Sequence, residues 1–191
     1  MSKTIALVMV DGPADWEYGP IMAAAHAWFG VGVVSATEDG KPVTSIGGLS
    51  IVPQRKIADL EPNEADLWIL PGSDHWAEKP IPEIIIAGLK TRIAAGRPVA
   101  GICGATLALA QAGLFESRPH TSNSLQFLQE NVSGYGGSAQ YREQPCVSDG
   151  RVVSASGTAP ISFAEACLRI LVPEQAEGID QFRAQFAREF A

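Results

Sequence analysis

The residue best placed to do chemistry in this sequence is Cys103, which lies between a strand-like run and a helix-like run. Residues 98–102 are apolar, residues 106–112 favour a helix, and small residues flank the cysteine in the segment AGICGA at 100–105. A sharp strand-to-helix turn of this kind is a nucleophile elbow, which exposes its side chain beyond the edge of a sheet. Because a helix N-terminus stabilises negative charge, we expect it to favour the reactive thiolate form of Cys103.

Other polar side chains follow the predicted strands at the same edge of the sheet. They are Glu17, which comes a short loop after the first strand; residues 72–75 (GSDH), which follow the strand at 66–70; and His120, which follows the helix after Cys103. In a parallel sheet, segments that follow different strands share one crevice. Glu17, His75 and His120 are therefore candidates to meet Cys103.

Strands and helices alternate along the chain, and this alternation predicts an α/β fold with a doubly wound, flavodoxin-like, mostly parallel sheet and helices on both faces. The predicted strands are residues 4–10, 31–36, 66–70, 98–102, 151–155 and a short one near Cys146. The predicted helices are residues 18–29, 81–95, 106–112, 158–171 and about 174–190. Residues 43–46 and 49–52 flank Gly47 and Gly48, which predicts a small β-hairpin with a two-residue turn.

The composition restricts the class of protein. With 191 residues, 46% of them hydrophobic, and no linker-like segment, the chain is expected to form one domain over residues 1–191. The net charge of -7 argues against a nucleic-acid surface, and no run approaches the roughly 20 apolar residues of a membrane span. Without signal-peptide anatomy or a C-x-x-C motif, we expect a cytoplasmic protein that has neither a disulfide framework nor a metal site.

Four segments together resemble the ThiJ/PfpI superfamily, which is related in fold to class I glutamine amidotransferases. They are residues 10–11 (VD) with Glu17 downstream, 70–72 (LPG), 100–105 (AGICGA) and 155–160 (ASGTAP). The resemblance extends to about residue 172. It implies that the protein acts on a small-molecule substrate without a cofactor and forms a homodimer.

The resemblance also implies roles for single residues. Cys103 would be an easily oxidised nucleophile, and Glu17 the carboxyl group that hydrogen-bonds it. The backbone N–H groups of Ser73 and Gly104 would form an oxyanion site, because any residue other than proline supplies this donor. His120 would match a histidine that some members place near the cysteine.

Two activities of the superfamily do not carry over to this sequence. PfpI-type peptidases have a histidine directly after the nucleophile, where this chain has Gly104, and the late His-x-Glu arrangement of glutamine amidotransferases is absent. The resemblance favours a cysteine-dependent hydrolase or lyase acting on an aldehyde, amide, isocyanide or glycated adduct. The alternative is a redox-sensing or protective protein in which Cys103 is oxidised to a sulfinate that Glu17 stabilises.

The remaining candidates are less specific. Trp16, Tyr18, His75 and Trp76 are expected to line the pocket, but their types do not select a ligand. Cys146 and Cys167 are interpreted as ordinary packed thiols, which is the usual state of a free cysteine. Near the C-terminus an apolar stripe leaves core packing and a dimer contact both open; its members are Ile179, Phe182, Phe186 and Phe190.

Overall fold

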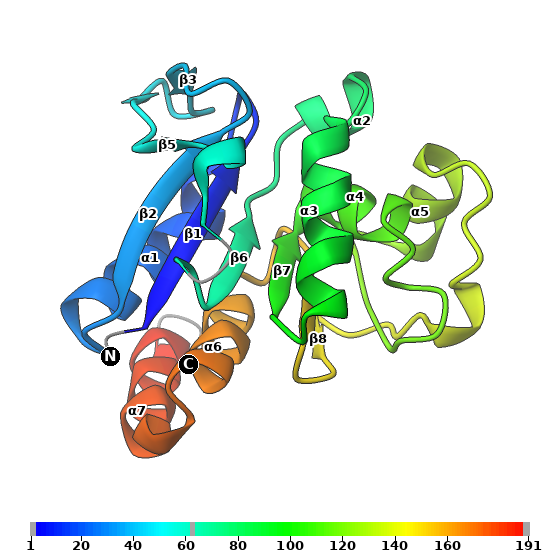
Figure 1. Ribbon diagram of the computed structural model, residues 1–191. Helices are drawn as coiled ribbons and strands as arrows, with labels where there is room; N and C mark the ends of the chain where they lie inside the picture. Colours follow the sequence, from blue (N-terminus) through cyan, green and yellow to red (C-terminus); the bar gives the residue numbers. More distant parts are fainter. Residues whose placement is uncertain (1–2, 62–63, 189–191) are drawn as a thin grey trace.

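A seven-stranded sheet forms the centre of the molecule (Figure 1). The computed structural model describes residues 3–61 and 64–188. The strands lie in the order β5-β2-β1-β6-β7-β9-β8, and every neighbouring pair is parallel except β8 with β9. Their bounds are β1 Thr4–Met9, β2 Gly32–Thr37, β5 Arg55–Lys56, β6 Leu67–Leu70, β7 Val99–Ile102, β8 Cys146–Ser148 and β9 Val152–Ala155. This confirms the predicted flavodoxin-like α/β fold.

Helices cover both faces of the sheet (Figure 1). One face packs against α1 Asp15–Ala27 and α6 Pro160–Leu171, and α7 Ala176–Ala187 packs against α6. The other face packs against α3 Glu83–Ala94 and α4 Thr106–Gln111, and both α2 His75–Glu78 and α5 Leu125–Asn131 pack against α4. Short 3-10 turns complete the chain: η1 Ile57–Asp59, η2 Cys103–Ala105, η3 Ser138–Gln140 and η4 Pro173–Gln175. Among the described residues, no helix is long and apolar enough to cross a membrane.

The two-sided burial of the sheet explains the apolar runs in the sequence. Every residue of β6, β7 and β9 is buried, as expected for parallel strands with helices on both faces. Because β2 pairs with one side of β1 and β6 with the other, the strand order reverses at β1. Ligands of doubly wound sheets bind at such a reversal, beyond the carboxyl ends of the strands.

The β-hairpin differs from its prediction. Strands β3 Val43–Thr44 and β4 Ser50–Ile51 pair as a separate sheet, and residues 45–49 connect them, so the predicted two-residue turn is wrong. The Ser45 N–H donates to the Leu49 carbonyl at 2.8 Å, which closes a longer loop. The loop is bent onto α1, where the Gly47 N–H donates to the Asp15 carboxylate at 2.8 Å.

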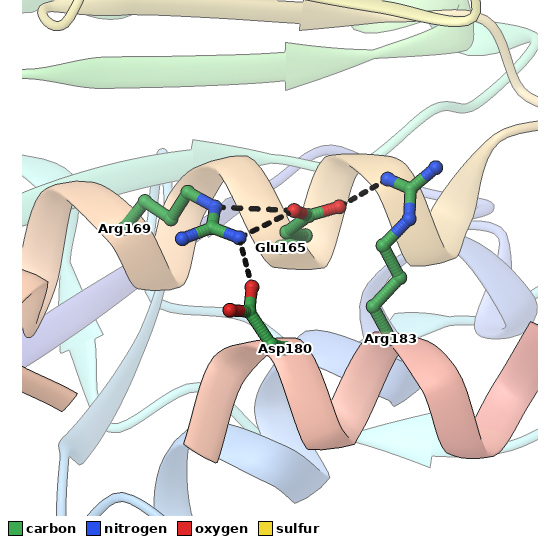
Figure 2. Close-up of polar contacts among 4 residues, drawn as sticks. All are labelled: Glu165, Arg169, Asp180 and Arg183. Carbon is green, nitrogen blue, oxygen red and sulfur yellow. Dashed lines mark hydrogen bonds and ion pairs between the residues drawn. The ribbon is translucent and has the colours of Figure 1, made fainter. Parts of the chain in front are cut away.

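The helix α7 is part of the core rather than an appendage. Ile179 and Phe182 are buried against α1 and α6, which favours core packing for this part of the apolar stripe; Phe190 and the end of the predicted helix lie outside the described residues. Figure 2 shows the ion pairs at the surface of the α6–α7 contact. The α6 carboxylate Glu165 lies between two guanidinium groups, those of Arg169 and Arg183. Because such exposed pairs contribute about 1 kcal/mol at most, apolar burial holds α7 in place.

Candidate active site

Cys103 lies at a strained turn directly after β7. Its φ of 58° makes it the one residue other than glycine with a positive φ among the described residues, and such a conformation costs about 1–3 kcal/mol. The surrounding contacts hold it: the Thr106 hydroxyl donates to the Cys103 carbonyl at 2.6 Å. The turn therefore has the geometry of a nucleophile elbow, with the thiol half-buried at the carboxyl edge of the sheet.

Glycines form the walls around the sulfur. A Cβ at Gly157 would lie 2.8 Å from Cys103 Sγ and 2.9 Å from Glu17 Oε1, and one at Gly72 would lie 2.7 Å from Cys103 Cβ. A Cβ at Gly104 would lie 2.5 Å from the Ser73 carbonyl oxygen. Side chains at these positions would fill the space beside the thiol, so glycine is what lets the three backbone segments approach it.

Glu17 extends from the first turn of α1 to the Cys103 thiol. The side chain is only 1% exposed, its Oε2 accepts a hydrogen bond from the Gly72 N–H at 2.6 Å, and its carboxyl group hydrogen-bonds Cys103. Burial raises the pKa of Glu17 to about 7, and the negative charge of Asp74 acts in the same direction. A carboxyl group with this pKa can carry a proton near neutral pH and can also give it away.

The thiol pKa is raised, contrary to the expectation from the helix N-terminus. Burial and the negative charge of Glu17 raise the pKa of Cys103 to about 11, although hydrogen bonds from the Asn123 side chain and the Gly104 N–H act in the opposite direction. Desolvation disfavours the charged thiolate more than the local dipoles favour it. Because the negative charge of Glu17 raises the pKa of Cys103, ionisation of the carboxyl group disfavours ionisation of the thiol.

Asn123 makes a third contact to the sulfur, which was not predicted from the sequence. The Asn123 Nδ2 group donates to Cys103 Sγ at 3.2 Å, and its Oδ1 accepts from the Gly157 N–H at 3.0 Å. The residue therefore connects the elbow after β7 with the loop after β9. Its signal in the sequence was weak, because a single asparagine in an irregular stretch has no spacing that points to a function.

The expectation that His120 serves Cys103 is corrected by the contacts of its ring. The imidazole is fully buried and stacks on Phe115, with ring centroids 4.1 Å apart. Its Nδ1 contacts the Arg118 carbonyl at 2.8 Å, and its Nε2 bonds the Tyr135 hydroxyl. Because both ring nitrogens have partners and burial lowers the pKa of His120, the histidine anchors the segment that carries Asn123.

The loop after β6 supplies backbone groups near the elbow. The Ser73 hydroxyl donates to the Asp11 carbonyl at 2.5 Å and accepts from the N–H of His75, at the start of α2, at 3.1 Å. Trp76 is buried, and its indole N–H donates to the Pro71 carbonyl at 2.8 Å. Trp76 thus supports the loop from behind, and the expectation that it lines a pocket is corrected.

Two aromatic candidates on α1 have different surroundings. Trp16 is 58% exposed, whereas the Tyr18 hydroxyl donates to the Asp15 carboxylate at 3.1 Å.

Burial raises the pKa of the Cys146 and Cys167 thiols, as it raises that of Cys103. The strained turn and the hydrogen bonds with Glu17 and Asn123, rather than a low pKa, therefore mark Cys103 as the candidate nucleophile. Within residues 3–61 and 64–188, no three His, Cys, Asp or Glu side chains gather where they could hold a metal ion.

Taken together, the fold and the site define a class of protein: a flavodoxin-like sheet that carries a cysteine at a strand-to-helix elbow beside a buried carboxyl group. A model of the DJ-1/PfpI family matches residues 3–170. The chain therefore belongs to the DJ-1/PfpI family.

Individual relatives support this assignment. The chain is 35% identical to a Bacillus subtilis protein named "Uncharacterized protease YoaZ", over 89% of this chain and 84% of the relative. A DJ-1 superfamily protein of Agrobacterium tumefaciens, Atu0886, has a crystal structure with a TM-score of 0.91 and 37% identity, covering 99% of this chain and 100% of that one. A thiJ/pfpI family protein of Bacillus anthracis has a TM-score of 0.81 and 34% identity, covering 90% and 84%.

Proposed function

We propose that this protein is a cysteine-dependent enzyme that adds Cys103 to a small electrophile. The observation that carries the proposal is the pair of Cys103 and Glu17, in which a buried carboxyl group with a pKa of about 7 hydrogen-bonds a half-buried thiol. The substrate class is an aldehyde, amide, isocyanide or glycated adduct, and the reaction is that of a hydrolase or a lyase. The glycine walls around the sulfur favour a small substrate.

The reaction begins when the Cys103 thiol passes its proton to the Glu17 carboxylate, which leaves the reactive thiolate beside protonated Glu17. The sulfur lone pair forms a bond to the electrophilic carbon, while the π electrons of the carbonyl group, or of its equivalent, move to the heteroatom. The backbone N–H groups of Ser73 and Gly104 are the proposed donors to this developing anion, and one such donor is worth about 10²–10³ in rate. Glu17 then gives its proton to the heteroatom and is left as a carboxylate, ready to accept a proton in the next step.

The name of the Bacillus subtilis relative, which includes the word protease, raises the question of proteolysis. A cysteine peptidase activates its thiol with an adjacent histidine base. Here the residue after the nucleophile is Gly104, and His120 is bonded elsewhere. The side chains that contact the sulfur are the Asn123 amide and the Glu17 carboxyl group. These contacts favour a small electrophile over a peptide bond as the substrate.

A redox role is the second candidate, and the same carboxyl group favours it. A protonated Glu17 would donate a hydrogen bond to a sulfinate at Cys103 as readily as to a thiolate.

Mild peroxide treatment followed by mass analysis tests this role. We expect a gain of two oxygens confined to Cys103 and lost in Glu17→Leu; equal oxidation of all three thiols would contradict it.

Turnover separates the two candidates. Small aldehydes, amides, isocyanides and glycated adducts are screened with the native protein, with Cys103→Ala and with the matched control Cys146→Ala. We expect more than one product molecule per protein molecule in the native protein and in the control, and none in Cys103→Ala. Turnover that persists in Cys103→Ala would exclude the proposed mechanism.

A further inference from the structure

Asn123 is the one exposed side chain in a short segment that is otherwise buried. His120, Thr121 and Ser122 precede it, and each is at most 2% exposed. The Thr121 N–H donates to the Ser154 hydroxyl at 2.9 Å, and the Ser122 hydroxyl bonds the Thr106 hydroxyl at 2.6 Å. The backbone that leads to Asn123 is therefore fixed both to β9 and to the helix that follows the elbow.

The amide of Asn123 has only one favourable orientation. Its Oδ1 accepts from the Gly157 N–H at 3.0 Å, which leaves the Nδ2 donors to face Cys103 Sγ at 3.2 Å. The reverse orientation would place Nδ2 against an N–H donor and Oδ1 against the sulfur, where negative charge develops. The Gly157 backbone thus fixes a hydrogen-bond donor, and not an acceptor, toward the thiol.

The Thr106 hydroxyl connects this arrangement to the elbow itself. It donates to the Cys103 carbonyl at 2.6 Å and bonds Ser122, the residue before Asn123. The strained backbone of the nucleophile and the backbone of its donor are consequently held by the same side chain. Thr106 therefore links the position of the Cys103 backbone to that of the segment that carries Asn123.

We propose that Asn123 is a catalytic residue, a fixed neutral donor that holds the thiolate of Cys103 while it attacks the substrate. The inference rests on the proposed function and extends it to a residue with no assigned role. An amide cannot remove a proton, so Asn123 does not act as a base. It supplies a second side-chain donor to the sulfur, beside that of protonated Glu17.

The electron and proton balance of the step is simple. The thiolate lone pair forms the S–C bond, the π electrons move to the substrate heteroatom, and the proton of Glu17 passes to that heteroatom. Asn123 keeps both of its protons throughout. Its hydrogen bond to sulfur weakens as the negative charge leaves the sulfur, so its principal effect is on the fraction of Cys103 that is ionised before the attack.

Ionisation of Cys103 can be measured without any substrate. The ultraviolet absorbance of the thiolate is recorded against pH for the native protein, Asn123→Ala and Asn123→Leu. For each protein, the curve of the same protein with Cys103→Ala added is subtracted, so that the difference reports on Cys103. The rate of Cys103 alkylation by iodoacetamide is followed in parallel by peptide mapping. Asn131→Ala serves as the matched control, because Asn131 is exposed and donates to the Phe127 carbonyl of its own helix.

We expect both Asn123 variants to raise the apparent pKa of Cys103 by about one unit, the size of a lost hydrogen bond to a charged group. Alkylation near neutral pH should slow by about three- to tenfold, since a thiolate of higher pKa is scarcer but more nucleophilic. The control should match the native protein. Titration curves of the variants that superimpose on the native curve would overturn the proposal, because a purely structural role changes access to the sulfur and not its ionisation.

The two variants and the two readouts keep the outcomes distinct. Leucine preserves most of the asparagine volume, so it reports on the donor even if the alanine variant folds poorly. If no substrate is turned over but the thiol pKa rises in the variants, the proposed enzymatic function fails while the donor role of Asn123 stands. If substrates are turned over but the thiol pKa is unchanged in the variants, the donor role of Asn123 fails while the proposed enzymatic function stands.

Discussion

At the scale of single residues, the chemistry of the site depends on the proton that Cys103 and Glu17 share. Burial raises the pKa of both groups, to about 11 and about 7, and each negative charge opposes the other. The state with one proton on the pair is therefore the relevant one above neutral pH. It can place the negative charge on the carboxylate or, with the donors of Asn123 and Gly104, on the sulfur.

The raised pKa of Glu17 predicts a pH-dependent stability. The folded state retains this proton between the ordinary pKa of 4.5 and about 7, whereas the unfolded chain releases it. The stabilisation is complete below about pH 4.5 and is lost as the pH rises through 7, a change on the order of 3 kcal/mol. Relative to the native protein, Glu17→Gln should gain about this free energy of unfolding across the same interval.

Urea unfolding at several pH values measures the difference between the two proteins. The exposed Glu143→Gln is the control and should follow the native protein at every pH. A Glu17→Gln curve parallel to the native one would show that Glu17 does not retain a proton in the folded state.

The glycine at 157 predicts a second effect at this scale. In Gly157→Ala the new Cβ would lie 2.8 Å from Cys103 Sγ and 2.9 Å from Glu17 Oε1, which forces the thiol and the carboxyl group to move. We expect alkylation of Cys103 to slow by at least about tenfold and stability to fall by about 1–3 kcal/mol. Gly136→Ala is the control, because a Cβ there meets nothing within 4 Å; equal rates in the two variants would contradict this role of Gly157.

At the scale of elements, the sequence predicted those that a periodic pattern defines. The strands β1, β6, β7 and β9 are largely buried apolar runs, and their pattern is readable because few polar residues interrupt it. Ser154 in β9 is such an exception. The helix α5 was not predicted, because it lies in an irregular polar stretch and begins at a Ser124 cap. The prediction of a two-residue hairpin turn was wrong, because a contact with α1, which is distant in sequence, decides the shape of the loop.

The site, like the elements, was predicted in part from the sequence. Cys103 and Glu17 follow strands at fixed short distances, so topology brings them to one edge. The residue types suggest that His120 contacts the sulfur, but Asn123, three residues further on, makes this contact. The His120 ring is bonded to Arg118 and Tyr135 instead. The spacing of residues in the sequence does not reveal which of the two side chains faces the sulfur.

A helix–sheet contact predicts the cost of a single methyl group. Gly88 on α3 packs against Trp68 on β6, and a Cβ there would lie 2.6 Å from the indole ring. Gly88→Ala should therefore lower stability by about 1–3 kcal/mol through overpacking. Gly136→Ala is the control: a Cβ there meets nothing within 4 Å, so alanine should leave stability nearly unchanged. Thermal unfolding distinguishes the two, and a loss of stability at Gly136 as large as at Gly88 would contradict the packing argument.

At the scale of the whole molecule, the exposed apolar side chains point to a second copy of the chain. Leu49 and Val52, at and just after the hairpin, are 62% and 70% exposed, and Ile46 and Trp16 are 48% and 58% exposed. The hairpin loop is bonded to α1, which carries Trp16, so these side chains belong to neighbouring elements. Apolar side chains gathered in this way are typical of protein–protein contacts. We predict that the protein is a homodimer through this surface.

Light scattering during gel filtration tests the oligomeric state. We expect the native protein to elute with the mass of a dimer and Leu49→Asp with the mass of a monomer, because a buried unpaired charge opposes association. The exposed Glu143→Gln serves again as the control and should remain dimeric. A native protein that is monomeric at all concentrations would contradict the prediction.

The claim that Cys103 is a catalytic nucleophile is tested most directly by intact mass analysis during turnover of the first substrate found. The account predicts a transient adduct on the protein that maps to Cys103, disappears as product is released and never forms in Cys103→Ala. Continued turnover with no adduct at Cys103, together with equal activity in Cys103→Ala, would contradict it.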